Sequence, residues 1–82
     1  MFIRSAEDLS LIIKAQRKKL NLSQSEAGDL VGLKQATVSE FENKPGSTKL
    51  DTLFRLLAAL NLEIVINVRG KPLKNVEWKE EW

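Results

Sequence analysis

The chain has 82 residues and a formal net charge of +2, and it contains neither cysteine nor histidine. This length predicts one domain, and a partner subunit is expected to stabilise it, because a chain near this size buries only about 60% of its unfolded surface. The missing residue types exclude disulfides and the usual metal sites and leave little for acid–base catalysis, so we expect no cofactor and no enzyme.

No apolar run approaches the roughly 20 residues that cross a bilayer, and the first residues lack the apolar centre of a secretory signal. We therefore expect a cytoplasmic protein with no membrane partner. The slight basic excess permits binding to nucleic acid but does not require it.

Four amphipathic runs predict a mainly α fold. The first run begins after Ser5, a good N-cap, and ends at Asn21, which tolerates a left-handed conformation. Arg17, near its end, is expected to pair with Glu42 as a structural clamp. The buried stripe of this run contains Leu9, Ile12, Ile13 and Leu20.

Ser23 caps the second run, and Glu26 completes a capping box three residues later. Gly32 ends that run after about two turns. The third run covers residues 35–42, and the turn-forming residues 43–47 make a loop.

Thr48 is the expected cap of the fourth run, with Asp51 answering three residues later, and Asn61 ends it. Its expected buried stripe is Leu50, Leu53, Phe54, Leu57 and Leu60.

Residues 62–69, Leu-Glu-Ile-Val-Ile-Asn-Val-Arg, change to a period of two, which predicts a strand. No second strand follows, so we expect this segment to pair with its copy in a second subunit as an antiparallel ribbon. Residues 2–4 are a candidate for a third strand beside this ribbon. The predicted domain covers residues 1–70, followed by a flexible tail over 71–82. The predicted dimerisation residues are Leu62, Ile64, Ile66 and Val68.

The second and third runs meet in a corner typical of a helix-turn-helix. Gly28 is the small residue where the helices cross, and Gly32 supplies the positive φ of the turn. The corner leaves a polar edge at the start of the third run, projecting from the body. The apolar residues expected to hold it are Ala27, Val31, Leu33, Val38 and Phe41.

The polar edge suits a DNA major groove, because an amide side chain can read adenine bidentately and a lysine can reach guanine or a phosphate. Gln35 and Lys34 fill these roles, and Ala36 is short enough to touch a thymine methyl group. The predicted phosphate contacts are Gln24, Ser25, Thr37, Lys44, Ser47, Thr48 and Lys49.

Residues 20–43, LNLSQSEAGDLVGLKQATVSEFEN, resemble the Xre/Cro-type helix-turn-helix family, whose pattern has a Leu-Ser/Thr-Gln start, a turn glycine and an ending in Phe/Ile-Glu-Asn. The resemblance extends over residues 5–61 and implies a lambda-repressor-like bundle of four to five helices. Gly28 stands where the family usually has alanine, which we expect to cost up to about 1 kcal/mol without changing the corner. The base contacts that the resemblance implies are Lys34, Gln35, Ala36 and Ser39.

Within that family, the motif, the segment after it and the terminal Glu-Trp look most like the antitoxins of HipA-like kinase toxins. This resemblance implies a homodimer that binds palindromic operator DNA, represses its own operon and sequesters the toxin. It implies toxin contact by Trp82, and Trp78 is a second candidate, because aromatic anchors are typical of interaction hot spots.

The same residues leave alternatives open. A stand-alone Xre-type repressor would use the corner without a toxin, and an interaction adaptor would bind a protein but no DNA. An enzyme is least favoured, because Glu40 and Glu42 lie on different faces of their helix and do not converge.

Overall fold

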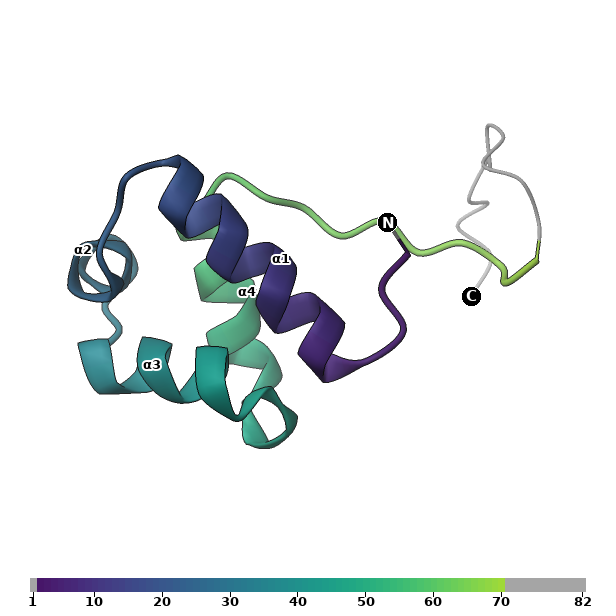
Figure 1. The fold of residues 1–82 in the computed structure, drawn as a ribbon, viewed down its shortest axis with the longest axis horizontal. Coiled ribbons are helices and arrows are strands. Elements are labelled where there is room, and N and C mark those ends of the chain that lie inside the picture. The colour runs from purple at the N-terminus through teal and green to yellow at the C-terminus, as the bar shows by residue number, and fades with distance from the viewer. Residues whose placement is uncertain (1, 71–82) are drawn as a thin grey trace.

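The computed structural model describes residues 2–70, so the predicted tail over 71–82, with Trp78 and Trp82, lies outside the described residues. The helices enclose one core, and residues 62–70 lead away from the end that carries α2 (Figure 1). The predicted mainly α bundle of four to five helices is confirmed. No helix of the described part is long and apolar enough to cross a membrane. In chain order the elements are α1 (Ala6–Lys19), α2 (Gln24–Asp29), α3 (Gln35–Asn43), the 3-10 turn η1 (Pro45–Ser47) and α4 (Leu50–Ala59).

Local hydrogen bonds set the predicted helix boundaries. At the start of α1, Ser5 Oγ accepts from the amide of Asp8 at 3.1 Å. The predicted capping box of α2 is formed, with the amide of Glu26 donating to Ser23 Oγ at 3.0 Å and the amide of Ser23 donating to Glu26 Oε1 at 2.9 Å. Asn21 has a φ of 57°, so α1 ends in the left-handed conformation that the sequence predicts.

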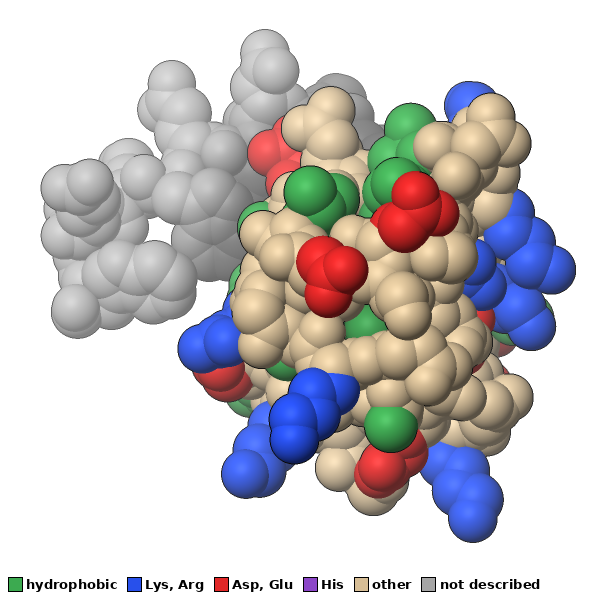
Figure 2. Space-filling view, turned by 90° about the vertical axis from the view of Figure 1, so that its left-hand side faces the viewer, with side chains coloured by type: hydrophobic (Ala, Val, Ile, Leu, Met, Phe, Trp, Pro, Cys, Tyr) green, Lys and Arg blue, Asp and Glu red, His purple; other side chains and the backbone are tan. Residues whose placement is uncertain are grey.

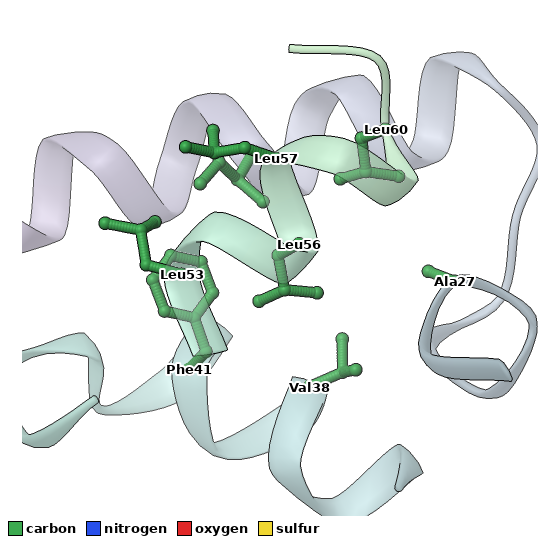
Figure 3. Packing of buried hydrophobic residues seen from close by; sticks show 8 residues of the cluster. Ala27, Val38, Phe41, Leu53, Leu56, Leu57 and Leu60 are labelled. Carbon is green, nitrogen blue, oxygen red and sulfur yellow. The ribbon is translucent and has the colours of Figure 1, made fainter. Parts of the chain in front are cut away.

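The core lies where α2, α3 and α4 converge on α1. In Figure 3, Leu56 of α4 points toward Val38 of α3, Leu53 lies beside the ring of Phe41, and Leu57 lies against α1. Val38 and Phe41 are 1% and 2% exposed, so one side of α3 is fixed in the core while the opposite side faces solvent. The buried apolar residues are Ile13, Ala27, Val38, Phe41, Leu53, Leu56, Leu57 and Leu60.

The buried side of α4 differs from the predicted one. Leu50 and Phe54 are 70% and 57% exposed, whereas Leu56, which the predicted stripe omits, is fully buried. Apolar residues surround much of α4, so periodicity alone does not select the buried face, and packing in the core selects it instead. Leu20 is also wrongly placed in the core: it lies one residue beyond α1 and is 43% exposed.

The predicted Thr48 cap of α4 is wrong. The N-cap is Lys49, and no side chain caps the first turn of α4. The amide of Thr48 instead closes η1 by donating to the carbonyl of Pro45 at 3.1 Å. Because η1 occupies Thr48, α4 begins one residue later and its first amides stay open.

The predicted strand over residues 62–69 does not form in the single chain. The amide of Leu62 donates to the carbonyl of Leu57 at 2.8 Å, and within residues 2–70 no further backbone hydrogen bond involves residues 63–70. A strand needs a ladder partner, and residues 2–4, the candidate third strand, form no strand and supply none. Pairing with a second copy stays a prediction.

Candidate nucleic-acid interface

Two glycines shape the corner between α2 and α3. Gly32 has a φ of 70°, the left-handed conformation that the turn is predicted to need. The carbonyl of Gly28 accepts from the amides of Val31 and Leu33 at 3.0 and 2.9 Å, which closes the turn. The corner therefore sets α3 across one end of the core.

Gly28 sits against this turn more tightly than predicted. A Cβ atom at this position would overlap the carbonyl oxygen of Leu33 and lie 3.3 Å from Cγ2 of Val38. An alanine would force the backbone of the turn to shift, so the expectation of an unchanged corner is wrong for this chain. The close approach of α2 to the turn requires glycine here.

A buried ion pair joins α3 to α1. The guanidinium of Arg17 donates to both carboxylate oxygens of Glu42, at 2.7 and 2.9 Å, and to the carbonyl of Leu22 at 2.8 Å. The side chain of Glu42 is only 1% exposed. The predicted clamp is confirmed, and its bidentate geometry fixes the orientation of α3.

The carboxylate of Glu42 stays ionised despite its burial. Burial raises its pKa, but hydrogen bonds from Arg17 and Gln24, together with the charges of Arg17 and Lys14, outweigh that effect and lower the pKa. The hydrogen bond to Glu42 likewise raises the pKa of Arg17. Both partners are therefore charged at neutral pH.

Gln24 connects this ion pair to the exposed start of α3. Its Nε2 donates to Glu42 Oε1 at 3.1 Å, and its Oε1 accepts from Gln35 Nε2 at 2.6 Å. Gln35 retains one amide N–H and its carbonyl oxygen, the donor and acceptor that the major-groove edge of adenine requires. Gln24 likewise keeps its second amide N–H, so its predicted phosphate contact can be made by this N–H or by its backbone amide.

The other predicted base contacts surround Gln35. Lys34 is the N-cap of α3 and is exposed, as is Ala36 one residue into the helix. Ser39 is half-buried, and its Oγ and carbonyl accept from Asn43 Nδ2 at 3.2 and 2.9 Å. The hydroxyl proton of Ser39 remains available to a base or phosphate acceptor.

The helix starts differ in what they offer a phosphate. Side chains cap α1 and α2, but no side chain caps α3 or α4. The open amides of α3 and α4 and the positive ends of their dipoles suit phosphate oxygens. At α2 the carboxylate of Glu26 already occupies the helix start, which makes Ser25 a less favourable phosphate contact.

Four predicted phosphate contacts share a hollow of about 440 Å³ between α3 and α4. Lys44 and Ser25 are exposed but do not line this hollow. The hollow adjoins the open start of α4, where backbone amides and side-chain hydroxyls can converge on one anion. The residues in question are Thr37, Ser47, Thr48 and Lys49.

The same hollow contains polar residues that the sequence argument missed as parts of the site. Arg55 pairs with Asp51 at 3.1 Å and donates to the carbonyl of Val31 at 3.5 Å, which links α4 to the turn. The sequence could have predicted this pair, because Asp51 and Arg55 are four residues apart on one helix. The missed residues are Glu40, Asp51, Thr52 and Arg55.

Figure 2 faces the end of the molecule that carries α2 and the start of α3. Uncharged surface covers much of this face, and acidic as well as basic side chains protrude from it. This mixture agrees with a net charge of only +2 and indicates recognition through individual contacts rather than through a uniform basic patch.

The predicted dimerisation residues lie away from the corner, on the segment that follows α4 (Figure 1). Leu62 packs against the core, whereas Ile64, Ile66 and Val68 are 42%, 71% and 61% exposed. Together with α1 and residues 2–4, this segment lines a largely apolar groove of about 890 Å³. Within the described part of one chain, Ile64, Ile66 and Val68 therefore stay uncovered.

Residues 13–66 match the family model described as Helix-turn-helix. The chain is similar to the antitoxin HipB of Escherichia coli strain K12, with 34% identity across 93% of each chain. It is similar to a chain of a HipB-O4 20mer complex, with a TM-score of 0.82 and 36% identity, covering 85% of this chain and 99% of that one. It is also similar to a chain of a HipA-HipB-O2-O3 complex, with a TM-score of 0.83, 36% identity and the same coverage.

Proposed function

The chain belongs to the helix-turn-helix family and, within it, to the family of HipB antitoxins, and from this premise we propose that it is a DNA-binding repressor and the antitoxin of a HipA-like kinase toxin. It binds palindromic operator DNA as a homodimer, represses its own operon and sequesters the toxin. One observation carries the DNA-binding part: the corner presents Gln35 at the exposed start of α3, held by Gln24 against the buried Arg17–Glu42 pair.

The proposed DNA-binding surface contains two groups of residues, one that contacts bases and one that contacts phosphates. Gln35 reads adenine, Lys34 reaches guanine or a phosphate, Ala36 approaches thymine, and Ser39 completes the base contacts. The open starts of α3 and α4 and the hollow between them bind phosphates and fix the register on the duplex. In a dimer the two copies of α3 enter successive major grooves about 34 Å apart.

Selection from random duplex DNA tests the DNA-binding part. We expect the enriched sequences to be palindromic, and their affinity to fall by about 10³- to 10⁵-fold between 50 and 200 mM salt if the dimer makes 6–10 phosphate contacts. A chain that enriches no sequence and shows no salt-dependent binding would instead be an interaction adaptor.

The toxin part draws on the HipB relative that occurs in a complex with HipA. We expect the chain to copurify with the HipA-like kinase encoded beside its own gene and to suppress the growth arrest which that kinase causes. Trp78 and Trp82 are the proposed anchors, so removing residues 71–82 should weaken toxin capture and leave DNA binding intact. Loss of both activities together would contradict this division, and DNA binding without any kinase partner would indicate a stand-alone repressor.

A further inference from the structure

Glu40 is a residue of α3 that the proposed base and phosphate contacts leave unused. It is exposed and lies one turn after Ala36, away from the side of α3 that buries Val38 and Phe41. Long side chains of a helix lean toward its N-terminus, so the carboxylate of Glu40 can reach over Ala36 toward the start of α3. The small side chain at position 36 leaves room for this carboxylate to approach the base edges of a groove that α3 enters.

Other carboxylates on these helices have partners, whereas that of Glu40 has none. Glu26 accepts a hydrogen bond at the start of α2, and Glu42 and Asp51 form ion pairs. Within residues 2–70 Glu40 forms no ion pair, although Arg55 lines the same hollow. An unpaired carboxylate on a DNA-binding surface repels the phosphates, so it weakens binding to every sequence unless the DNA donates a hydrogen bond to it.

The position of Glu40 favours a partner among the bases over one at the backbone. Glu40 also lines the hollow that is proposed to hold a phosphate. Two anions repel each other there, so a bound phosphate favours rotamers of Glu40 that turn away from the hollow and toward Ala36. Phosphate binding therefore directs the carboxylate toward the base edges.

Few groups of the major groove suit a carboxylate. An ionised carboxylate only accepts hydrogen bonds, and the donors in this groove are the amino groups of cytosine and adenine. Guanine presents two acceptors and thymine one, so both oppose a carboxylate. The amino group of adenine lies between two acceptors, its own N7 and the O4 of the paired thymine, whereas that of cytosine has one acceptor neighbour, the O6 of guanine. Cytosine is therefore the base that fits best.

We propose that Glu40 reads a cytosine in each half-site by accepting a hydrogen bond from its N4 amino group, and that it rejects guanine and thymine at that position. The proposal rests on the DNA binding of the proposed function and adds a base to those contacted by Lys34, Gln35, Ala36 and Ser39. Gln35 offers a donor and an acceptor, whereas Glu40 offers acceptors alone, so the two side chains select different bases.

Selection from random duplex DNA, with the full chain and two variants, tests the assignment. The native chain should enrich cytosine at one position of each half-site. Glu40→Ala should lose that preference, and Glu40→Gln should shift it to adenine, because a glutamine amide pairs bidentately with N6 and N7 of adenine. The preference at the base pair read by Gln35 should persist in both variants, which shows that they remain folded and bind in the same register.

Affinities on defined operators measure the size of the contact. Replacing the cytosine by guanine or thymine in one half-site should weaken binding of the native chain by about fivefold to thirtyfold. The same replacement should change the affinity of Glu40→Ala by less than about twofold, since alanine offers no acceptor to any base.

Asp51→Asn is the matched control, because it removes one exposed negative charge from the same hollow. It acts on phosphates alone, so any change in affinity should be the same for all operators. If Glu40→Ala gives only such a uniform change and selects the same bases as the native chain, the reading of cytosine is overturned while DNA binding stands. A native chain that enriches no palindromic sequence would overturn the proposed function and this inference with it.

Discussion

The helical body and the segment after α4 differ in how their polar groups and apolar side chains are satisfied within one chain. In the body, no buried side-chain nitrogen or oxygen within the described residues lacks a hydrogen-bond partner, and the internal charge of Glu42 is neutralised by Arg17. In residues 63–70 the backbone has no backbone partner within the described part, and several apolar side chains are more than half exposed. The body is complete as one chain, whereas the segment has the character of half an interface.

Ile66→Asp should separate the two regions most sharply. Asp would place a carboxylate among apolar side chains that are predicted to pair with a second copy, so we expect a monomer whose helical circular dichroism is retained. Losing the link between two DNA-binding units should weaken operator binding by about 10²- to 10⁴-fold. Sedimentation and fluorescence anisotropy measure the two effects, and Leu11→Asp, at a 62% exposed position of α1 outside the groove, is the control. Loss of helicity in Ile66→Asp would show that the body is not self-sufficient.

Arg17→Met tests whether the buried Arg17–Glu42 ion pair stabilises the helical body. It leaves the buried carboxylate of Glu42 without its partner, and we expect it to lower the free energy of unfolding by about 3–5 kcal/mol. Urea denaturation measures the loss. Lys18→Met, at the exposed neighbouring position, should change stability by less than about 0.5 kcal/mol. A loss in Arg17→Met no larger than that of the control would show that the ion pair does not stabilise the helical body.

The same ion pair should make the body sensitive to acid. The pKa of Glu42 is lowered in the folded chain, so its contribution to stability is fully present above the unfolded pKa of about 4.3 and is lost as pH falls through the folded pKa. We expect the urea midpoint to decrease on acidification below about pH 5. Glu42→Gln should reduce that dependence, and an unchanged slope in this variant would mean that other carboxyl groups cause it.

Gln35→Ala tests whether the exposed start of α3 reads bases. We expect it to cost about 1–3 kcal/mol of operator binding and to relax preference at one base pair in each half-site. Gln24→Ala should relax the same base pair less strongly, because it releases the amide of Gln35 without removing it. Binding measured across a panel of operator variants distinguishes these results from a uniform loss on all sequences, which would contradict base reading by Gln35.

The contrast between body and segment also decides what the sequence could predict. Caps and turns depend on a few neighbouring residues, so Ser5, Ser23 with Glu26, Asn21 and Gly32 were predictable one by one. The Arg17–Glu42 pair was also predicted, but residue spacing does not single it out among the other cations and carboxylates, because its geometry depends on how α1 packs on α3.

The residue pattern of the sequence could not predict features that depend on three-dimensional packing. The buried face of α4 excludes Leu50 and Phe54 because the apolar residues of α4 cover more than half of its circumference and the core admits only part of them. The overlap that forbids a Cβ atom at Gly28 depends on the path of the turn, and the Gln24–Gln35 bond depends on how two helices cross. Neither has a signature in residue spacing.

The smallest expected effect concerns Asp51, where stability and binding should move in opposite directions. Its ion pair with Arg55 is exposed, with the carboxylate side chain 77% accessible, so Asp51→Asn should cost only about 0.5 kcal/mol of stability. The same change removes a negative charge from the hollow that contains Thr37, Thr48 and Lys49.

If that hollow holds a phosphate, the variant should bind operator about twofold to fivefold more tightly at low salt, and the gain should fade as salt screens the charge. Unchanged affinity at low salt would move the phosphate contacts away from the hollow, to exposed residues such as Lys44. A gain that persists at high salt would require a cause other than charge, because an exposed carboxylate acts on a phosphate through a screened field.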